Sequence, residues 1–313
     1  MSIEVLEPGV LTTVQDPVGR RSWRHLGVPV GGAADAYSAR LANRLVGNPD
    51  GGALLEMALV GATLRFGAAA IVALTGGLEA AIGGIALPRG RARRVRAGAV
   101  LAVREGRGAR GYLAVGGGID VPVTLGSFST ELRSGFGGLE GRALRAGDRL
   151  ELGTTPGGPT RRNGTLRDSE APVRIVDGPH PDALGALTGQ AFTVGQQADR
   201  IGVRTSEGIE GGGEVPSMGL PLGAIQLPPD GRPIVMLADR PVTGGYRVPA
   251  VVIAADIGRV AQLRPGDRMR FASVSLAEAR AAWAEAEAEL AALEPLSVDE
   301  REDGELGWIG SHS

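Results

Sequence analysis

The sequence predicts a mainly β fold made of two halves, with a few short helices and one helix near the C-terminus. Three observations support this fold class. Short apolar runs alternate with Gly-rich turns, which favours barrels or sandwiches over a parallel α/β sheet. A stretch rich in Gly, Pro, Thr and Arg at 154–171 is typical of a linker. Related turn patterns at 145–150 and 264–269 stand near the ends of the two halves and indicate a duplicated architecture.

These observations set the expected domain boundaries. The chain has 313 residues, which is enough for about two domains. We expect an N-terminal β subdomain at 1–155, a linker at 156–171, a C-terminal β subdomain at 172–274, and a helix with a polar tail at 275–313.

Composition and charge narrow the classes of function. Hydrophobic residues make up 43% of the chain and charged residues 22%, and the net charge is −2. These values are typical of a soluble globular protein, and they give no basic field for nucleic acid. The N-terminus does not resemble a secretory leader, and no apolar run is long enough to cross a bilayer. We therefore expect a cytoplasmic protein without membrane or nucleic-acid partners.

Two residue types are missing, cysteine and lysine, so all 33 basic side chains are arginine. Without cysteine there is no disulfide, thiolate nucleophile or sulfur-bound zinc, and we expect no metal site. Without lysine there is no Schiff base, no Walker-type phosphate loop and no attachment point for biotin. A genomic bias toward arginine codons explains most of the arginine count. Arginine nevertheless supplies forked donors suited to carboxylate, phosphate or ureido groups.

The first segment, 3–16, reads as two short strands around a Pro-Gly turn. Gln15 and Asp16 then lead into an arginine-rich loop at 19–29 that contains His25. A lone histidine is more often structural than catalytic. Because His25 stands among Arg20, Arg24 and Asp16, its titration would be tuned by charged neighbours, and it is a candidate functional residue.

A glycine turn and a helix follow, and then the pattern becomes β. Asp35 reads as the N-cap of a helix at 36–46. The start of this helix could bind an anion through free backbone N–H groups, although capping alone explains Asp35. Between 53 and 115 we expect strands at 53–59, 62–66, 70–75, 100–103 and 111–115. Glu56 interrupts an apolar strand, so it needs an arginine or backbone donors as partners.

The second half contains the densest group of polar residues. Gln197, Asp199, Arg200 and Gln226 lie at predicted strand ends, where polar side chains can converge on a cleft. The half closes with a capping box, Ser275 to Glu278, which predicts the C-terminal helix.

The stretch 233–246 contains several residues of types that are common in functional sites. A short apolar strand ends in Asp239 and Arg240, and Gly244, Gly245 and Tyr246 follow. The two glycines predict a tight turn or a close approach of a ligand to the main chain. A salt bridge and a turn at a strand end would also explain the stretch, so its partners elsewhere in the chain decide between the two interpretations.

Several motifs together resemble the biotin-dependent carboxyltransferase family, also labelled allophanate hydrolase subunit 2, KipA-like, or the C subunit of 5-oxoprolinase. The motifs run in order along most of the chain, at 11–16, 25–29, 40–43, 117–122, 226–231 and 237–246. Two positions depart from the family. Residues 31–35 read Gly-Gly-Ala-Ala-Asp where Ser-Gly-Ala-Met-Asp is common, and 247–249 read Arg-Val-Pro where many members have Pro-Lys-Ile.

The resemblance implies two cyclophilin-like β-barrel halves and hetero-oligomeric partners. The partners would be a KipI-like chain, which is the B-type subunit of 5-oxoprolinase, and a LamB/YcsF-like chain, which is its A-type subunit. The implied activity is ATP-dependent opening of 5-oxoproline to L-glutamate, with ATP held by this chain or by a partner. One alternative is a carboxyltransferase that moves a carboxyl group to urea or a similar small amide from biotin delivered in trans. The other is a non-catalytic KipA-like regulator that sequesters a KipI-like partner.

The residues for this chemistry fall into two groups. Catalytic roles are assigned to His25, Asp239, Arg240 and Tyr246. We expect them to face one cavity between the two halves, and we expect alanine at His25 or Asp239 to abolish turnover without unfolding the chain. Substrate-binding roles are assigned to Gln15, Asp16, Asp35, Gln197, Asp199, Arg200, Gln226, Gly244 and Gly245.

Overall fold

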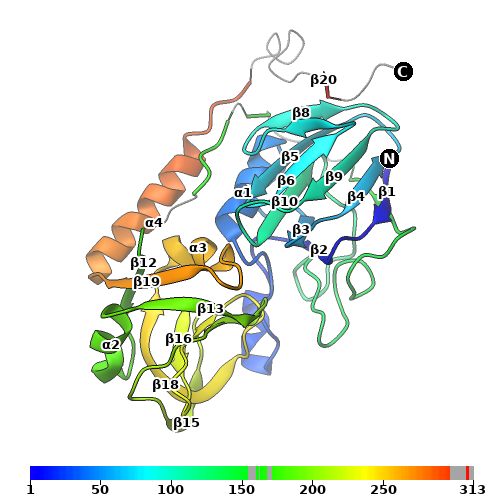
Figure 1. The fold of residues 1–313 in the computed structure, drawn as a ribbon. Coiled ribbons are helices and arrows are strands. Elements are labelled where there is room, and N and C mark those ends of the chain that lie inside the picture. Colours follow the sequence, from blue (N-terminus) through cyan, green and yellow to red (C-terminus); the bar gives the residue numbers. More distant parts are fainter. Residues whose placement is uncertain (154–159, 162, 168–170, 297–307, 310–313) are drawn as a thin grey trace. The chain divides into compact units, whose positions relative to one another are not determined.

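The structure, a computed structural model, describes residues 1–153, 160–161, 163–167, 171–296 and 308–309. It divides into two compact units. The first contains residues 1–19, 35–167 and 289–313, and the second contains 20–34 and 168–288. Figure 1 shows the strands of the first unit mostly in blue and cyan and those of the second in green to orange. The predicted mainly β fold with few helices is confirmed.

Two sheets build the first unit. One sheet has the order β11 (Arg149–Glu151), β1 (Ser2–Glu7), β4 (Thr63–Phe66), β9 (Val100–Arg104), β6 (Glu79–Ile82) and β7 (Ile85–Leu87). The other has the order β2 (Leu11–Gln15), β3 (Leu54–Ala58), β10 (Arg110–Val115), β5 (Ala70–Gly76), β8 (Ala92–Val95) and β20 (Trp308–Ile309). Neighbouring strands are antiparallel, except that β20 runs parallel to β8.

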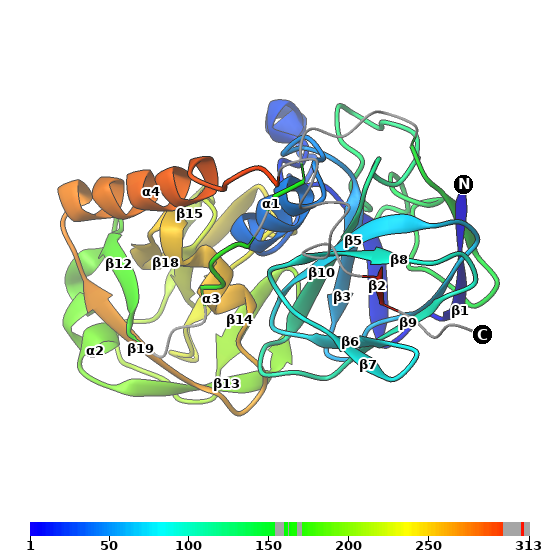
Figure 2. The same ribbon diagram turned by 90° about the horizontal axis from the view of Figure 1, so that it is seen from above.

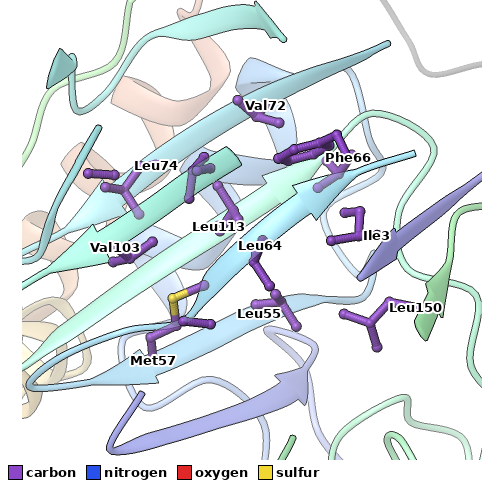
Figure 3. Close-up of a cluster of buried hydrophobic side chains, with 14 of the residues drawn as sticks. Ile3, Leu55, Met57, Leu64, Phe66, Val72, Leu74, Val103, Leu113 and Leu150 are labelled. Carbon is purple, nitrogen blue, oxygen red and sulfur yellow. The ribbon is translucent and has the colours of Figure 1, made fainter. Parts of the chain in front are cut away.

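One apolar core lies between these sheets. Alternation along β1 turns Ile3 and Val5 inward, because side chains two apart share a face of a strand. Figure 3 shows Ile3 and Leu64 of one sheet lying with Leu55 and Leu113 of the other in a single cluster. This apolar burial is the main favourable term that holds the two sheets together.

A helix and a buried ion pair complete the first unit. Helix α1 (Ala36–Leu45) packs on β5 and β10, and its predicted N-cap is confirmed because Asp35 accepts the Ser38 N–H at 3.0 Å. Glu56 has the arginine partner that the sequence required, since Arg110 Nε lies 3.9 Å from its Oε1.

The second unit is a closed barrel. Its ring has the order β12 (Val173–Asp177), β19 (Arg268–Ser273), β13 (Ala191–Ala198), β14 (Gly202–Thr205), β17 (Ile234–Met236), β16 (Ala224–Leu227) and β18 (Thr243–Val252). Figure 2 labels β12, β13, β14, β18 and β19 around the barrel. Pairing of β12 with β18 closes the ring, and β15 (Glu214–Gly219) adds to β18 outside it. Closure leaves no unpaired edge in the ring.

Short helices lie on this barrel. They are α2 (Leu184–Thr188), α3 (Ile257–Ala261) and the 3-10 turns η2 (Pro181–Ala183) and η3 (Ala254–Asp256). Ile257 and Val260 of α3 belong to the barrel core, together with the aromatic pair Phe192 and Phe271, whose ring centroids lie 5.7 Å apart.

The predicted capping box begins the long helix α4 (Leu276–Ala291). Ser275 N–H and Oγ–H donate to Glu278 Oε2 at 2.7 and 2.8 Å, and Glu278 N–H donates back to Ser275 Oγ at 3.2 Å. None of the helices within the described residues is long and apolar enough to pass through a membrane.

The two units differ from the expected boundaries in two places. Residues 20–34 group with the second unit, and residues from 289 onward group with the first. Each segment makes a side-chain hydrogen bond within the unit that it joins. Arg200 in the second unit binds the Gly32 carbonyl, and Tyr37 in the first unit binds Glu289 at 2.9 Å. Residues 156–159, 162 and 168–170 of the expected linker lie outside the described residues.

Candidate functional site

The arginine-rich loop 20–34 is tied to the second unit through its backbone. Arg20 N–H donates to the Val30 carbonyl at 2.7 Å, which closes the loop. Gly31 N–H donates to the Ala238 carbonyl at 3.2 Å. Inside the loop lies the 3-10 helix η1 (Arg21–Leu26). The loop is thereby joined to the stretch that contains Asp239.

A bidentate ion pair between Arg200 and Asp239 lies next to this junction. Nε and Nη2 of Arg200 donate to the two carboxylate oxygens at 2.8 and 2.9 Å. Arg200 Nη2 also donates to the Gly32 carbonyl at 2.6 Å. Arg200 and Asp239 are only 6% and 7% exposed. A forked contact of this kind fixes the orientation of the carboxylate as well as its position.

Local backbone structure explains why Arg200 points there. Asp199 Oδ1 accepts the N–H groups of Ile201 and Gly202 at 2.7 and 3.1 Å. These bonds cap the turn between β13 and β14 and leave Arg200 at its tip. Asp239 N–H then donates to the Arg200 carbonyl at 2.9 Å.

Gly31 lies next to the same carboxylate and to another buried arginine. Its φ is +63°, a conformation that favours glycine. A Cβ at this position would lie 3.4 Å from Arg20 Nη1 and 3.8 Å from Asp239 Oδ1. The guanidinium of Arg20, a residue that is 1% exposed, and the Asp239 carboxylate therefore both flank the Gly31 backbone.

Arg240 and Arg24 converge on a single main-chain oxygen. Arg240 Nε and Arg24 Nη2 donate to the Leu220 carbonyl at 3.1 and 2.9 Å, and Arg240 Nη1 donates to the Leu237 carbonyl at 3.2 Å. Within the described residues neither guanidinium forms an ion pair with a carboxylate. Burial and then the charge of Arg24 lower the pKa of Arg240 to about 10. Arg240 therefore stays charged at neutral pH in surroundings that disfavour a cation.

Gln226 completes this region, and it corrects the expectation of a turn at Gly244 and Gly245. Both glycines lie inside strand β18. A Cβ on Gly244 would sit 2.4 Å from Gln226 Nε2 and 2.6 Å from Leu220 Cδ1. Glycine at 244 thus permits a close approach to the main chain, and the group that approaches is the chain's own amide. Gln226 is 4% exposed, and its Nε2 has no hydrogen-bond partner among the described residues.

Other predicted residues of this unit lie apart from these contacts. His25 is exposed, and its Nδ1 pairs with the Ser22 carbonyl at 3.1 Å. No hydrogen bond or ion pair joins His25 to Asp239 in the part of the chain that the structure describes. Tyr246 is half-buried in β18 opposite Glu214, and Gln197 is exposed on β13.

Asp16 belongs to the first unit, where its carboxylate is an anchor for two loops. Oδ1 accepts the N–H groups of Val18 and Gly19 at 2.8 and 2.7 Å. Oδ2 accepts the Phe128 N–H at 2.7 Å and the Ser127 hydroxyl. Bonds of this number explain a buried carboxylate by structure alone.

Gln15 and Asp35 also lie in the first unit. Gln15 Nε2 donates to Thr13 Oγ1 at 3.0 Å and to the Thr130 carbonyl at 3.3 Å, whereas its buried Oε1 has no partner among the described residues. Asp35 Oδ2 accepts the Ser38 hydroxyl at 2.6 Å in addition to capping α1. The substrate-binding roles of these residues stay predictions.

Sequence reasoning misses part of the cluster. The sequence indicates Arg20 and Arg24 only as neighbours of His25, and it gives no sign of the Leu220 carbonyl. The available signal is the density of arginine in the loop 19–29. Within the described residues, no group of three or more His, Cys, Asp and Glu side chains could hold a metal ion.

The second unit therefore presents a cation-rich polar cluster, which we define as Arg20, Arg24, Arg200, Gln226, Asp239 and Arg240. Four guanidinium groups accompany one carboxylate in this cluster. Such an arrangement can bind an anionic group and stabilise negative charge that develops on an oxygen. Asp239, held in place by Arg200, can in turn accept a hydrogen bond from a ligand N–H.

Comparisons with known proteins agree along most of the chain. Residues 26–273 match the family model "Carboxyltransferase domain, subdomain A and B". The chain is 37% identical over 288 residues to the C subunit of 5-oxoprolinase from Escherichia coli, covering 88% of this chain and 93% of that protein. It is 33% identical to urea amidolyase of Lachancea kluyveri, covering 99% of this chain but only 18% of that protein.

A solved structure gives the same picture. The crystal structure of Kluyveromyces lactis urea carboxylase superimposes with a TM-score of 0.86 at 30% identity, over 96% of this chain and 30% of that chain. The chain thus corresponds to nearly a whole protein in one case and to one portion of a long protein in the others. The family model and the bacterial relative together establish that this chain belongs to the carboxyltransferase domain family, subdomains A and B.

Proposed function

We propose that this chain is one subunit of an ATP-dependent 5-oxoprolinase that opens 5-oxoproline to L-glutamate together with partner subunits. The observation that carries the proposal is the similarity to the C subunit of E. coli 5-oxoprolinase over 93% of that protein. The identity to that subunit, 37%, is higher than the 33% identity to urea amidolyase, which favours the 5-oxoprolinase function.

The cluster in the second unit suits this reaction. An unactivated lactam needs its oxygen converted into a better-stabilised group, and phosphorylation by ATP supplies that conversion. Arg200 and neighbouring donors would stabilise negative charge on the lactam oxygen, and Asp239 would orient the ring N–H. The chain has no lysine and so no Walker-type loop, and we assign ATP to a partner subunit. The expected partners are a KipI-like chain of the B type and a LamB/YcsF-like chain of the A type.

Reconstitution tests the proposal. The chain would be purified with the KipI-like and LamB/YcsF-like chains of its own organism, and ADP and L-glutamate would be measured. We expect both products in equal amounts, dependent on 5-oxoproline, and lost when this chain is omitted. Equal rates with and without this chain, or no glutamate from the full set of subunits, would contradict the proposal.

A carboxyltransferase function is the second candidate, favoured by the family model and by the match to urea carboxylase over 96% of this chain. The residues fit a biotin ureido ring, because the unpartnered Gln226 amide can donate to its carbonyl and Asp239 can accept its N–H. Bound carboxybiotin would supply the transferred carboxyl group. Because the chain lacks lysine, biotin would have to arrive on another protein.

One assay distinguishes the 5-oxoprolinase function from the carboxyltransferase function. Labelled carboxyl transfer to urea would be measured with a biotin carboxylase and carrier added in trans. Label in the product without 5-oxoproline-dependent ADP release would favour the carboxyltransferase. ADP and glutamate without label would exclude it for urea.

A further inference from the structure

Two arginines of the second unit share one acceptor and lack an acidic partner. Arg24 and Arg240 both donate to the Leu220 carbonyl, and the other acceptor of Arg240 is the Leu237 carbonyl. Among the described residues no carboxylate forms an ion pair with either. This distinguishes them from Arg200, which Asp239 neutralises, and from Arg204, which pairs with Asp230 at 3.1 Å.

Such a pair is unfavourable unless a third group is present. Two like charges at hydrogen-bond distance from the same oxygen repel each other, and burial removes the water that would screen them. Arg240 is only 6% exposed. Neutral carbonyls satisfy N–H donors without cancelling the charge. An anion would cancel it, and donors remain to bind one, since Arg240 Nη2 and Arg24 Nη1 make no hydrogen bond among the described residues.

A second, independent observation concerns a buried amide beside Leu220, the residue whose carbonyl the two arginines share. Gln226 is only 4% exposed, and its Nε2 has no partner among the described residues. The amide lies beside the Leu220 side chain, because a Cβ on Gly244 would touch both Gln226 Nε2 and Leu220 Cδ1. A buried donor without an acceptor costs free energy that a bound acceptor would recover.

We propose that Arg24, Arg240 and Gln226 form a receptor for a carboxylate group, which we call the carboxylate receptor. A guanidinium fork matches the two oxygens of a carboxylate, and an amide N–H adds a third donor. The identity of the ligand rests on the proposed function. 5-Oxoproline carries a carboxylate beside its lactam ring, so the receptor would hold the carboxylate while the ring is opened. Urea is neutral and offers no such handle.

Binding to paired ligands tests the receptor directly. The full-length chain, alone and assembled with its partner subunits, would be titrated calorimetrically with L-5-oxoproline and with 2-pyrrolidone, the same lactam without the carboxylate. We expect 5-oxoproline to bind at least about tenfold more tightly, because the lactam without a carboxylate leaves the guanidinium donors unpaired. Arg24→Gln and Arg240→Gln should each remove this preference, and Arg204→Gln, which deletes an ion-paired charge from the same unit, should keep it.

Several results would overturn the receptor. They are equal affinity for the two lactams, an unchanged preference in Arg24→Gln, or tighter binding of inorganic phosphate than of 5-oxoproline. Arg24 is half-buried, so Arg24→Gln is expected to fold even where Arg240→Gln does not, and melting temperatures check both.

The receptor and the proposed function can fail separately. If the assembled complex opens 5-oxoproline and Arg24→Gln leaves KM unchanged, the receptor is wrong and the function stands. If the complex has no such activity but acetate raises the melting temperature of the wild-type chain and not that of Arg24→Gln, the function is wrong and the receptor stands.

Discussion

Asp239 and His25, the two central residues of the predicted active site, differ in burial and therefore in the roles they can have. Asp239 is 7% exposed and holds both donors of the Arg200 fork, whereas His25 is exposed on a 3-10 helix. A substitution at Asp239 therefore acts on stability as well as on any ligand. The expectation that alanine at Asp239 leaves the fold intact has to be revised, while the same expectation for His25 is consistent with its exposure.

We predict that Asp239→Ala lowers the free energy of unfolding by about 3–5 kcal/mol, because it leaves the Arg200 guanidinium buried without its carboxylate. The double variant Asp239→Leu, Arg200→Met should recover most of this loss, since it removes both charges together. His25→Ala should change the free energy by no more than about 0.5 kcal/mol. Urea titrations followed by circular dichroism measure all three. An Asp239→Ala protein as stable as wild type would show that the pair contributes nothing to the fold.

In strand β18, tertiary packing and not local sequence preference determines the backbone conformation. The sequence Thr-Gly-Gly-Tyr has the residues of a turn, yet it forms the start of a ten-residue strand. The glycine at 244 is needed for space, because Gln226 occupies the volume of a Cβ. Propensity is a weak guide here, since the packing of β16 against β18 outweighs it.

We predict that Gly244→Ala destabilises the protein by about 1–3 kcal/mol, because the new methyl group overlaps Gln226 and Leu220. Gln226→Ala in the same chain should relieve most of that cost. Gly219→Ala on the neighbouring strand is the matched control, because a Cβ there meets nothing within 4 Å. The melting temperatures of the three variants test this prediction. Equal losses of stability at 244 and 219 would contradict the packing argument.

At the scale of the whole molecule, carboxylates held by arginine occur in both units. Hydrogen bonds from Arg142 lower the pKa of Asp148 in the first unit. In the second, burial alone would raise the pKa of Asp256, but hydrogen bonds from Arg174 and the charges of Arg259 and Arg174 lower it. Because the partners are arginines, they remain charged throughout the acidic and neutral pH range.

We therefore predict acid sensitivity. A carboxylate whose pKa is lower in the folded state contributes stability above its unfolded pKa of about 3.9, and this contribution is lost as pH falls through the folded value. Urea midpoints should be steady down to about pH 5 and fall below about pH 4. Asp148→Asn should flatten this fall, whereas Glu79→Gln, at an exposed residue that makes no ion pair among the described residues, should not. The same slope in all three proteins would refute the assignment.

Local sequence patterns are sufficient to predict many features of the fold. The capping box at Ser275, the N-cap at Asp35 and the arginine partner of Glu56 follow from short-range rules or from the cost of burying a charge. The cluster of the second unit is only partly predictable. The sequence indicates Arg200, Asp239, Arg240 and Gln226, but it groups them with His25.

By itself the sequence determined a mainly β protein, several of its strands, the starts of α1 and α4, and the exclusion of cysteine and lysine chemistry. These features depend on residue type, spacing and near neighbours, which the sequence displays directly. Only the tertiary structure decided that the loop 20–34 belongs to the second unit, that Arg200 and not His25 binds Asp239, and that Arg24 and Arg240 share one carbonyl. The contact between Arg200 and Gly32 joins residues 168 positions apart. Contacts of that range depend on how strands pair around a closed barrel, and no local periodicity encodes that pairing.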